Sequence, residues 1–272
     1  MSSAENDAYI LGTEQAELYR LGFQHQVWAS EARTGWEFAQ FGVGQTILDL
    51  GCGPGFCTRD LAYMVGESGK VIGIDKSPSY IEFLEKTAKL HSLNIETICS
   101  EFNNFILPEN SVDGIYHRWA LAWIDNPEQI IDKLYKALKP GGIIVSQEYY
   151  KWSTFQTEPQ MPGLTSGIQA AKEVWAGMEG DINVGRKLPS MFYEAGLEVI
   201  NTRTLNKIAT AEDLSWQWPK SFFNIFLPKL AADGYISEEE VEAALSDFEK
   251  LEMIEGATMS FPTMIEVIAV KP

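Results

Sequence analysis

Three glycines occupy alternate positions behind a short apolar run in the segment ILDLGCGPGF, residues 47–56. Glycine lets ligand atoms approach the backbone closely and tolerates left-handed turns. An apolar strand, a glycine turn and a helix are typical of a site for a nucleotide-like ligand at the carboxyl end of a sheet. The pattern predicts such a ligand over Gly51 and Gly53, with Gly55 turning the chain into the helix. For the glycines alone, a tight turn without a ligand is the alternative.

The second feature that could do chemistry is Asp75, which ends the apolar segment KVIGID 24 positions after Gly51. A carboxylate there can accept hydrogen bonds from both hydroxyls of a ribose. The glycine spacing differs from the dinucleotide fingerprint G-x-G-x-x-G, because the third glycine comes one position early. Pro54 also lacks the backbone N–H that a pyrophosphate would need. We therefore expect a ligand that carries a ribose but no diphosphate.

The elements that position these residues follow from the alternation of apolar and helical segments. Helices are expected behind Ser77-Pro78 and Asn126-Pro127, where a capping side chain precedes a proline at the first helical position. Strands are expected at 45–51, 70–75, 95–102, 111–120, 143–150, 197–205 and 261–272. Strands that alternate with helices predict an α/β fold, here a doubly wound, Rossmann-like and mostly parallel sheet of seven strands.

Composition narrows the classes of function. The chain has 272 residues, a net charge of −17 and a sequence pI of about 4.6, which argues against a nucleic-acid partner because phosphates need a basic face. Three cysteines are too few and too irregular for a disulfide framework or a metal site, so a reducing compartment is expected. No secretory signal and no apolar run of membrane-spanning length is apparent. The sequence thus predicts a cytoplasmic protein with no membrane partner and no metal, and leaves a homodimer open.

Several motifs occur together in one order. They are LDLGCGPG at 48–55, Asp75, LPENSVDGIYHRWALAWI at 107–124 and LKPGG at 138–142. Over residues 40–150 the chain resembles the class I S-adenosylmethionine-dependent methyltransferases, and most of all the small-molecule enzymes similar to the ubiquinone/menaquinone C-methyltransferases. The resemblance implies S-adenosylmethionine as cofactor, S-adenosylhomocysteine as product and a small organic molecule as methyl acceptor.

The resemblance also implies a division of the chain. Residues 1–40 would form an N-terminal helical lid, and 41–210 plus 259–272 the cofactor-binding methyltransferase domain. Residues 211–258 would be a helical cap insertion over the acceptor, because they are dense in aromatic residues.

Cofactor contacts are expected residue by residue from the same resemblance. Arg20 or Gln24 in the lid would meet the methionine carboxylate, and a solvated helix face is the alternative for both. The remaining positions are Asp49, Gly51, Cys52 and Gly53 at the methionine half, Asp75 at the ribose, Lys76, Glu101 and Phe102 at the adenine, and His117 and Arg118 between methionine and acceptor.

Methyl transfer needs a positioned acceptor and, for a hydroxyl or a carbon acid, a base. Three residues near strand ends are the catalytic candidates, namely His117, Glu148 and Tyr149. For His117 the alternative is a histidine that bonds to local backbone. A non-catalytic module that binds S-adenosylmethionine, or a regulatory subunit, is the alternative function, and the glycine spacing disfavours a nicotinamide oxidoreductase.

Overall fold

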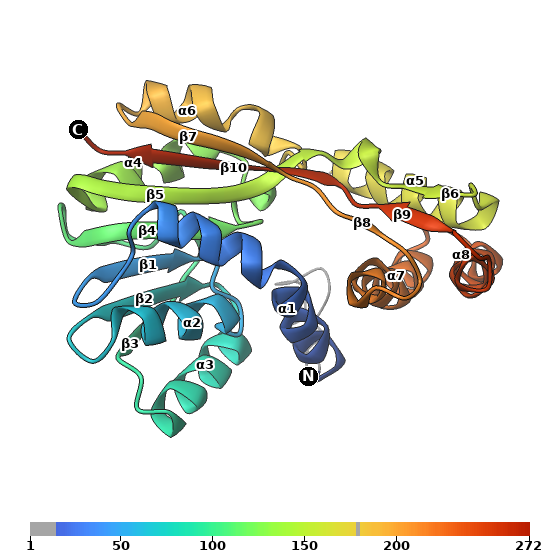
Figure 1. Cartoon of the computed structure of the whole chain (residues 1–272), viewed down its shortest axis with the longest axis horizontal. Helices are drawn as coiled ribbons and strands as arrows, with labels where there is room; N and C mark the ends of the chain where they lie inside the picture. Colours follow the sequence, from blue (N-terminus) through green and yellow to red (C-terminus); the bar gives the residue numbers. More distant parts are fainter. Residues whose placement is uncertain (1–14, 178–179) are drawn as a thin grey trace.

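The computed structural model describes residues 15–177 and 180–272 (Figure 1). The first part of the predicted lid, residues 1–14, lies outside the described residues. Seven strands form the main sheet in the order β3-β2-β1-β4-β5-β10-β7. Their bounds are β1 Thr46–Leu50, β2 Lys70–Asp75, β3 Ile95–Cys99, β4 Val112–Arg118, β5 Leu138–Lys151, β7 Glu198–Leu205 and β10 Thr263–Val270.

The direction of the strands confirms the predicted doubly wound fold. The first five strands pair in parallel, and β10 is antiparallel to both β5 and β7. The chain runs outward from β1 to β2 and β3, then returns to place β4 on the other side of β1. The strand order therefore reverses between β1 and β4, and in such sheets ligands bind at the carboxyl ends beside this point.

Helices cover both faces of the sheet (Figure 1). One face packs on α1 Gln15–Phe38 and α2 Phe56–Val65, with α3 Pro78–Leu90 beside them, and this face buries Trp36, Leu61 and Val145. The other face packs on α4 Pro127–Ala137 and α6 Leu188–Glu194. Both layers bury large apolar clusters against the sheet.

Local sequence signals begin several of these helices. The Ser77 hydroxyl accepts from the Tyr80 N–H at 3.4 Å, and the Asn126 side chain accepts from the Gln129 N–H at 3.2 Å. In each case a proline follows as the first helical residue, as the sequence predicts.

A second layer of structure lies beyond one end of the main sheet (Figure 1). It consists of α5 Pro162–Ala176, α7 Gln217–Ala232, α8 Glu238–Glu252 and an antiparallel sheet of β6 Gln156–Glu158, β9 Thr258–Ser260 and β8 Ile208–Ala209. Short 3-10 turns complete the chain at η1 Leu121–Trp123, η2 Trp152–Thr154, η3 Val184–Arg186 and η4 Leu214–Trp216. Helix α5 packs against α8, so this layer draws on chain before β7 as well as on residues 211–258.

Among the described helices, none is long and apolar enough to cross a membrane.

Candidate active site

A cavity of about 400 Å³ lies at the carboxyl ends of the central strands, where the sequence places the glycine turn. One side is polar and is formed by the turn after β1, the end of β2 and the loop after β3. The other side is aromatic and comes from the ends of β4 and β5 and from α5 and α7. Helix α1 contributes Arg20, Gln24 and His25 to the same cavity, so α1, the main sheet and the second layer all meet there.

The glycine turn has the backbone geometry that the spacing predicts. Gly51, Gly53 and Gly55 all have positive φ, at 72°, 53° and 84°. At Gly53 a Cβ atom would meet no atom within 4 Å, whereas at Gly55 it would clash with Leu84. Gly53 therefore opens onto the cavity, while Gly55 allows the turn to pack on α3.

Asp75 fastens this turn to the end of β2. Its two carboxylate oxygens accept from the N–H groups of Gly53 and Ser77, each at 2.9 Å. Burial raises the pKa of Asp75, and the two backbone hydrogen bonds oppose that shift. The carboxylate also lines the cavity, where its remaining lone pairs can accept hydrogen bonds from a ligand.

Asp49 is the second carboxyl group on the polar side. Its side chain is 2% exposed and accepts a hydrogen bond of 2.6 Å from the Thr58 hydroxyl. Burial raises the pKa of Asp49 to about 6 in spite of that bond and of the positive charge of Arg118. A cationic ligand group beside Asp49 would favour its charged form.

The residues predicted around an adenine ring divide into two sets. Lys76 and Phe102 line the cavity. Glu101 is not among the lining residues; its side chain is exposed and lies 3.9 Å from the Lys76 ammonium group. Cys52, predicted at the methionine half, also lines the cavity.

The lid residues are already paired. Arg20 is 2% exposed and makes two contacts of 2.7 Å with the Glu17 carboxylate. Arg20 also donates to the side-chain oxygen of Gln24 at 3.0 Å, and the same oxygen accepts from the Trp218 indole N–H at 2.9 Å. The alternative of a solvated face is thus wrong for Arg20, which lies at the contact between α1 and α7.

Strand β4 separates two neighbouring predicted residues. Arg118 lines the cavity, whereas His117 is fully buried and is not among the lining residues. Successive side chains of a strand point to opposite faces, so His117 packs on the side of the sheet that faces α4. Its Nδ1 lies 3.1 Å from Glu148, which also accepts from the N–H groups of Ala120 and Leu121 at 2.9 Å.

This placement corrects the expected position of two catalytic candidates, because His117 and Glu148 lie behind the cavity wall, where Glu148 supports the turn after β4. The partner of His117 is the Glu148 side chain and not local backbone, so the alternative also differs from the structure. Tyr149 is the one of the three catalytic candidates that lines the cavity, and its ring stacks on Trp119 at 5.4 Å between centroids.

The aromatic side contains residues that the sequence did not single out. They are Trp119, Trp152, Phe155 and Trp175, which join Trp218, Phe222, Phe223 and Phe226 from the predicted cap. Trp119 and Trp152 directly follow the ends of β4 and β5, and Phe155 follows the short turn after β5, so the rule that sites lie at carboxyl ends could have identified them. His25 and Cys57 also line the cavity.

Within residues 15–177 and 180–272, no group of three or more His, Cys, Asp or Glu side chains could hold a metal ion.

Comparisons with known proteins agree on one family. The profile of the methyltransferase domain matches residues 42–196, more than half of the chain. The demethylmenaquinone methyltransferase of Desulfitobacterium hafniense is 24% identical over 191 residues, covering 65% of this chain and 73% of that protein. The arsenite methyltransferase of Halobacterium salinarum is 29% identical over 166 residues, covering 60% and 40%.

Solved structures agree on the fold. The geranyl diphosphate C-methyltransferase of Streptomyces coelicolor superposes with a TM-score of 0.56 at 12% identity, covering 91% of this chain and 77% of that one. The chain spans less than half the length of several of the curated relatives that it matches.

Proposed function

Because the chain belongs to the class I S-adenosylmethionine-dependent methyltransferases, we propose that it transfers a methyl group from that cofactor to a small, largely apolar organic acceptor. The observation that carries the proposal is the single cavity that joins the glycine turn to the aromatic side. A donor held on the polar side would present its methyl group to an acceptor held between the aromatic rings.

The residues of the polar side fit the cofactor. The open space at Gly53 is a position that any Cβ would fill, and it lets a ligand lie against the backbone. We assign the ribose hydroxyls to Asp75, the methionine half to Asp49, Gly51 and Cys52, and the adenine to Lys76 and Phe102. Arg118 and the lid residue Gln24 close this side.

The aromatic side supports an acceptor with a flat apolar body. Trp119 lies between Tyr149 and Trp218, with ring planes within 20° of each. The indole N–H groups of Trp119 and Trp152 are buried without a hydrogen-bond partner. Because an unpaired buried donor is costly, we propose that an oxygen atom of the acceptor accepts from one of them.

The proposed reaction requires the protein mainly to position the two substrates. When bound, S-adenosylmethionine supplies an electrophilic methyl group. The protein's own residues hold the acceptor in line and exclude water through the aromatic side. Tyr149 is the catalytic candidate left at the cavity, and we propose that its hydroxyl orients the nucleophilic atom of the acceptor.

The partner is proposed to be a small molecule and not a nucleic acid, which the net charge of −17 supports. Cytoplasmic location and oligomeric state stay predictions.

Two measurements test the function. Calorimetry should detect binding of S-adenosylmethionine, and S-adenosylhomocysteine should accumulate when flat, oxygen-bearing apolar compounds are supplied. Binding without turnover across such a panel and across a metabolite extract would favour the alternative of a non-catalytic module. Absence of binding would overturn the proposal, and a thermal shift with a nicotinamide cofactor would redirect it.

A further inference from the structure

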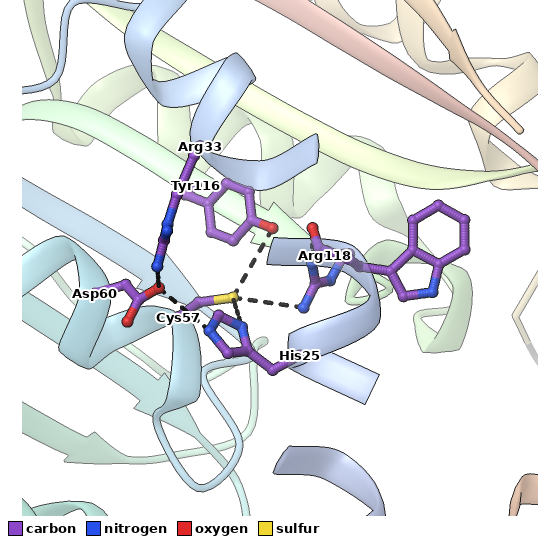
Figure 2. Close-up of polar contacts among 7 residues, drawn as sticks. His25, Arg33, Cys57, Asp60, Tyr116 and Arg118 are labelled. Atoms are coloured by element: carbon purple, nitrogen blue, oxygen red, sulfur yellow. Dashed lines mark hydrogen bonds and ion pairs between the residues drawn. The ribbon is translucent and has the colours of Figure 1, made fainter. Parts of the chain in front are cut away.

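A cluster of charged groups surrounds one cysteine between α1 and α2 (Figure 2). The Cys57 sulfur lies 3.5 Å from Nδ1 of His25 and 3.5 Å from a terminal nitrogen of Arg118. On the far side of the imidazole, Nε2 of His25 lies 3.3 Å from the Asp60 carboxylate, which also accepts from Arg33 at 3.0 Å. Cysteine, histidine and aspartate thus stand in a chain of contacts.

The hydrogen positions follow from the chemistry of the partners. Burial by itself would lower the pKa of His25, but its hydrogen bonds to Asp60 and Cys57 outweigh burial and raise it to about 9. At neutral pH both ring nitrogens therefore carry hydrogens. A guanidinium group can only donate, and the Tyr116 hydroxyl gives its hydrogen to Gln147 at 3.0 Å. The Cys57 thiol can donate its own hydrogen to the Tyr116 oxygen at 4.0 Å. Both cations therefore direct N–H groups at the sulfur, where they can stabilise negative charge that develops on it during attack.

The other two cysteines have the opposite surroundings. Burial raises the pKa of Cys52 well above its ordinary value, and the charges of Asp49 and Asp75 add to the shift. Burial also raises the pKa of Cys99, helped by Asp75 and Glu85. Carboxylates thus keep Cys52 and Cys99 as thiols, whereas Cys57 faces an imidazolium and a guanidinium.

A ligand can reach the Cys57 sulfur. The residue is half-buried and lines the cavity together with Gly53 and Phe56. A small molecule that enters the cavity therefore meets a sulfur nucleophile with a proton donor, His25, beside it.

We propose that the Cys57 sulfur is a nucleophile and that small α,β-unsaturated carbonyl compounds entering the cavity become covalently attached to it. The sulfur bonds to the β-carbon, and the π electrons of the carbon–carbon double bond move to the carbonyl as an enolate. The α-carbon then takes the proton of the His25 imidazolium, and the proton that the sulfur gave up restores the imidazolium, so no oxidant or reductant is needed. The attached group would lie beside the glycine turn and obstruct it.

N-ethylmaleimide, an α,β-unsaturated imide, is the probe. The whole protein is treated with less than one equivalent at pH 7, and each cysteine is followed by peptide mass spectrometry. We expect Cys57 to react at least tenfold faster than the exposed Cys99, and Cys52 to stay unmodified. Cys57→Ser should abolish the fast reaction, and Cys99→Ser is the matched control that should leave it unchanged.

The role of the imidazolium is tested separately. His25→Gln, which keeps a polar side chain but no charge, should slow labelling of Cys57 at least tenfold, and Asp60→Asn should slow it by a smaller factor. Circular dichroism and the labelling rate of Cys99 show whether each variant is folded. Faster labelling of Cys99 than of Cys57, or an unchanged rate in a folded His25→Gln variant, would overturn the proposal. The measurement uses neither cofactor nor acceptor, so its outcome is independent of methyl transfer.

Discussion

The two sides of the cavity are built in different ways. The polar side is formed mainly by the glycine turn and the Asp75 carboxylate. Asp75 accepts from the N–H of Gly53, and Gly53 exposes its backbone to the cavity. On the aromatic side, rings from several separate segments share the wall, among them Trp119, Tyr149, Trp175 and Trp218. We therefore expect cofactor binding on the polar side to depend on a few positions, and acceptor binding on the aromatic side to be distributed over many.

The largest effect is expected at the turn. Gly53→Val should lower affinity for S-adenosylmethionine by more than about 1000-fold, because a β-branched side chain would fill the open space and would be strained at a φ of 53°. Calorimetry measures the affinity, and circular dichroism shows whether the variant folds. A folded variant with ordinary affinity would contradict the assigned place of the cofactor.

The next largest effect on cofactor binding is expected at Asp75, beside the glycine turn. Asp75→Ala removes an acceptor for the ribose hydroxyls and frees the Gly53 N–H, so we expect a loss of about 2–4 kcal/mol in binding. That range corresponds to roughly 30- to 900-fold in Kd. Glu96→Ala, an exposed acid near the end of the same sheet, is the control and should change Kd little. Equal effects of the two changes would remove Asp75 from the site.

The polar side should also reduce stability in a pH-dependent way. In the folded protein Asp49 keeps its proton up to about pH 6, whereas in the unfolded chain it loses it near its ordinary value of 3.8. The folded state thus holds an extra proton between these values, and the free energy of unfolding falls as pH rises from about 4 to 6.

Asparagine cannot ionise, so Asp49→Asn removes the fall in the free energy of unfolding between pH 4 and 6. We expect the variant to have a free energy of unfolding higher by an amount on the order of 3 kcal/mol at pH 8 and little changed at pH 4. Urea titrations at the two pH values measure the difference, with the exposed Asp125→Asn as control. A gain of equal size at both pH values would show that charge burial is not its cause.

Replacing a single ring on the aromatic side should change binding less than replacing a single residue of the glycine turn. Trp119→Leu keeps apolar volume but loses the stacks with Tyr149 and Trp218, so we expect KM for the acceptor to rise about tenfold. The Kd for S-adenosylmethionine should stay within about threefold. Tyr193→Leu, at an exposed aromatic residue 79% accessible to solvent, is the control for KM. A change in cofactor affinity without a change in KM would assign Trp119 to the other side.

The smallest effect on turnover is expected at His117, behind the wall of the cavity. His117→Gln should leave kcat within about threefold, because the side chain is fully buried against Glu148 and away from the cavity. It should lower the free energy of unfolding by about 1–3 kcal/mol, since a buried hydrogen bond is disturbed. Steady-state kinetics and urea titration separate the two, and a fall of 100-fold in kcat would restore His117 as a base.

The same contrast explains what could be predicted from the sequence. The sheet, the helix starts at Ser77 and Asn126 and the turn at Gly51–Gly55 depend on periodicity, capping and glycine, which are local properties. His117 was misplaced because one residue along a strand exchanges the two faces of the sheet. Trp175 reaches the cavity through packing of α5 on segments distant in the sequence, with its ring against Trp152 and Phe226, and no local pattern encodes such packing.

Helix α1 touches both sides of the cavity, and this limits how the protein can be re-engineered. The Gln24 carbonyl accepts from Arg20 in the lid and from Trp218 in α7, and Trp28 packs edge-on against both Trp119 and Trp218. A chimera that exchanges residues 211–258 for the matching segment of a relative would leave Gln24 and Trp28 facing foreign partners. We therefore expect that a change of acceptor requires exchanging the second layer together with helix α1.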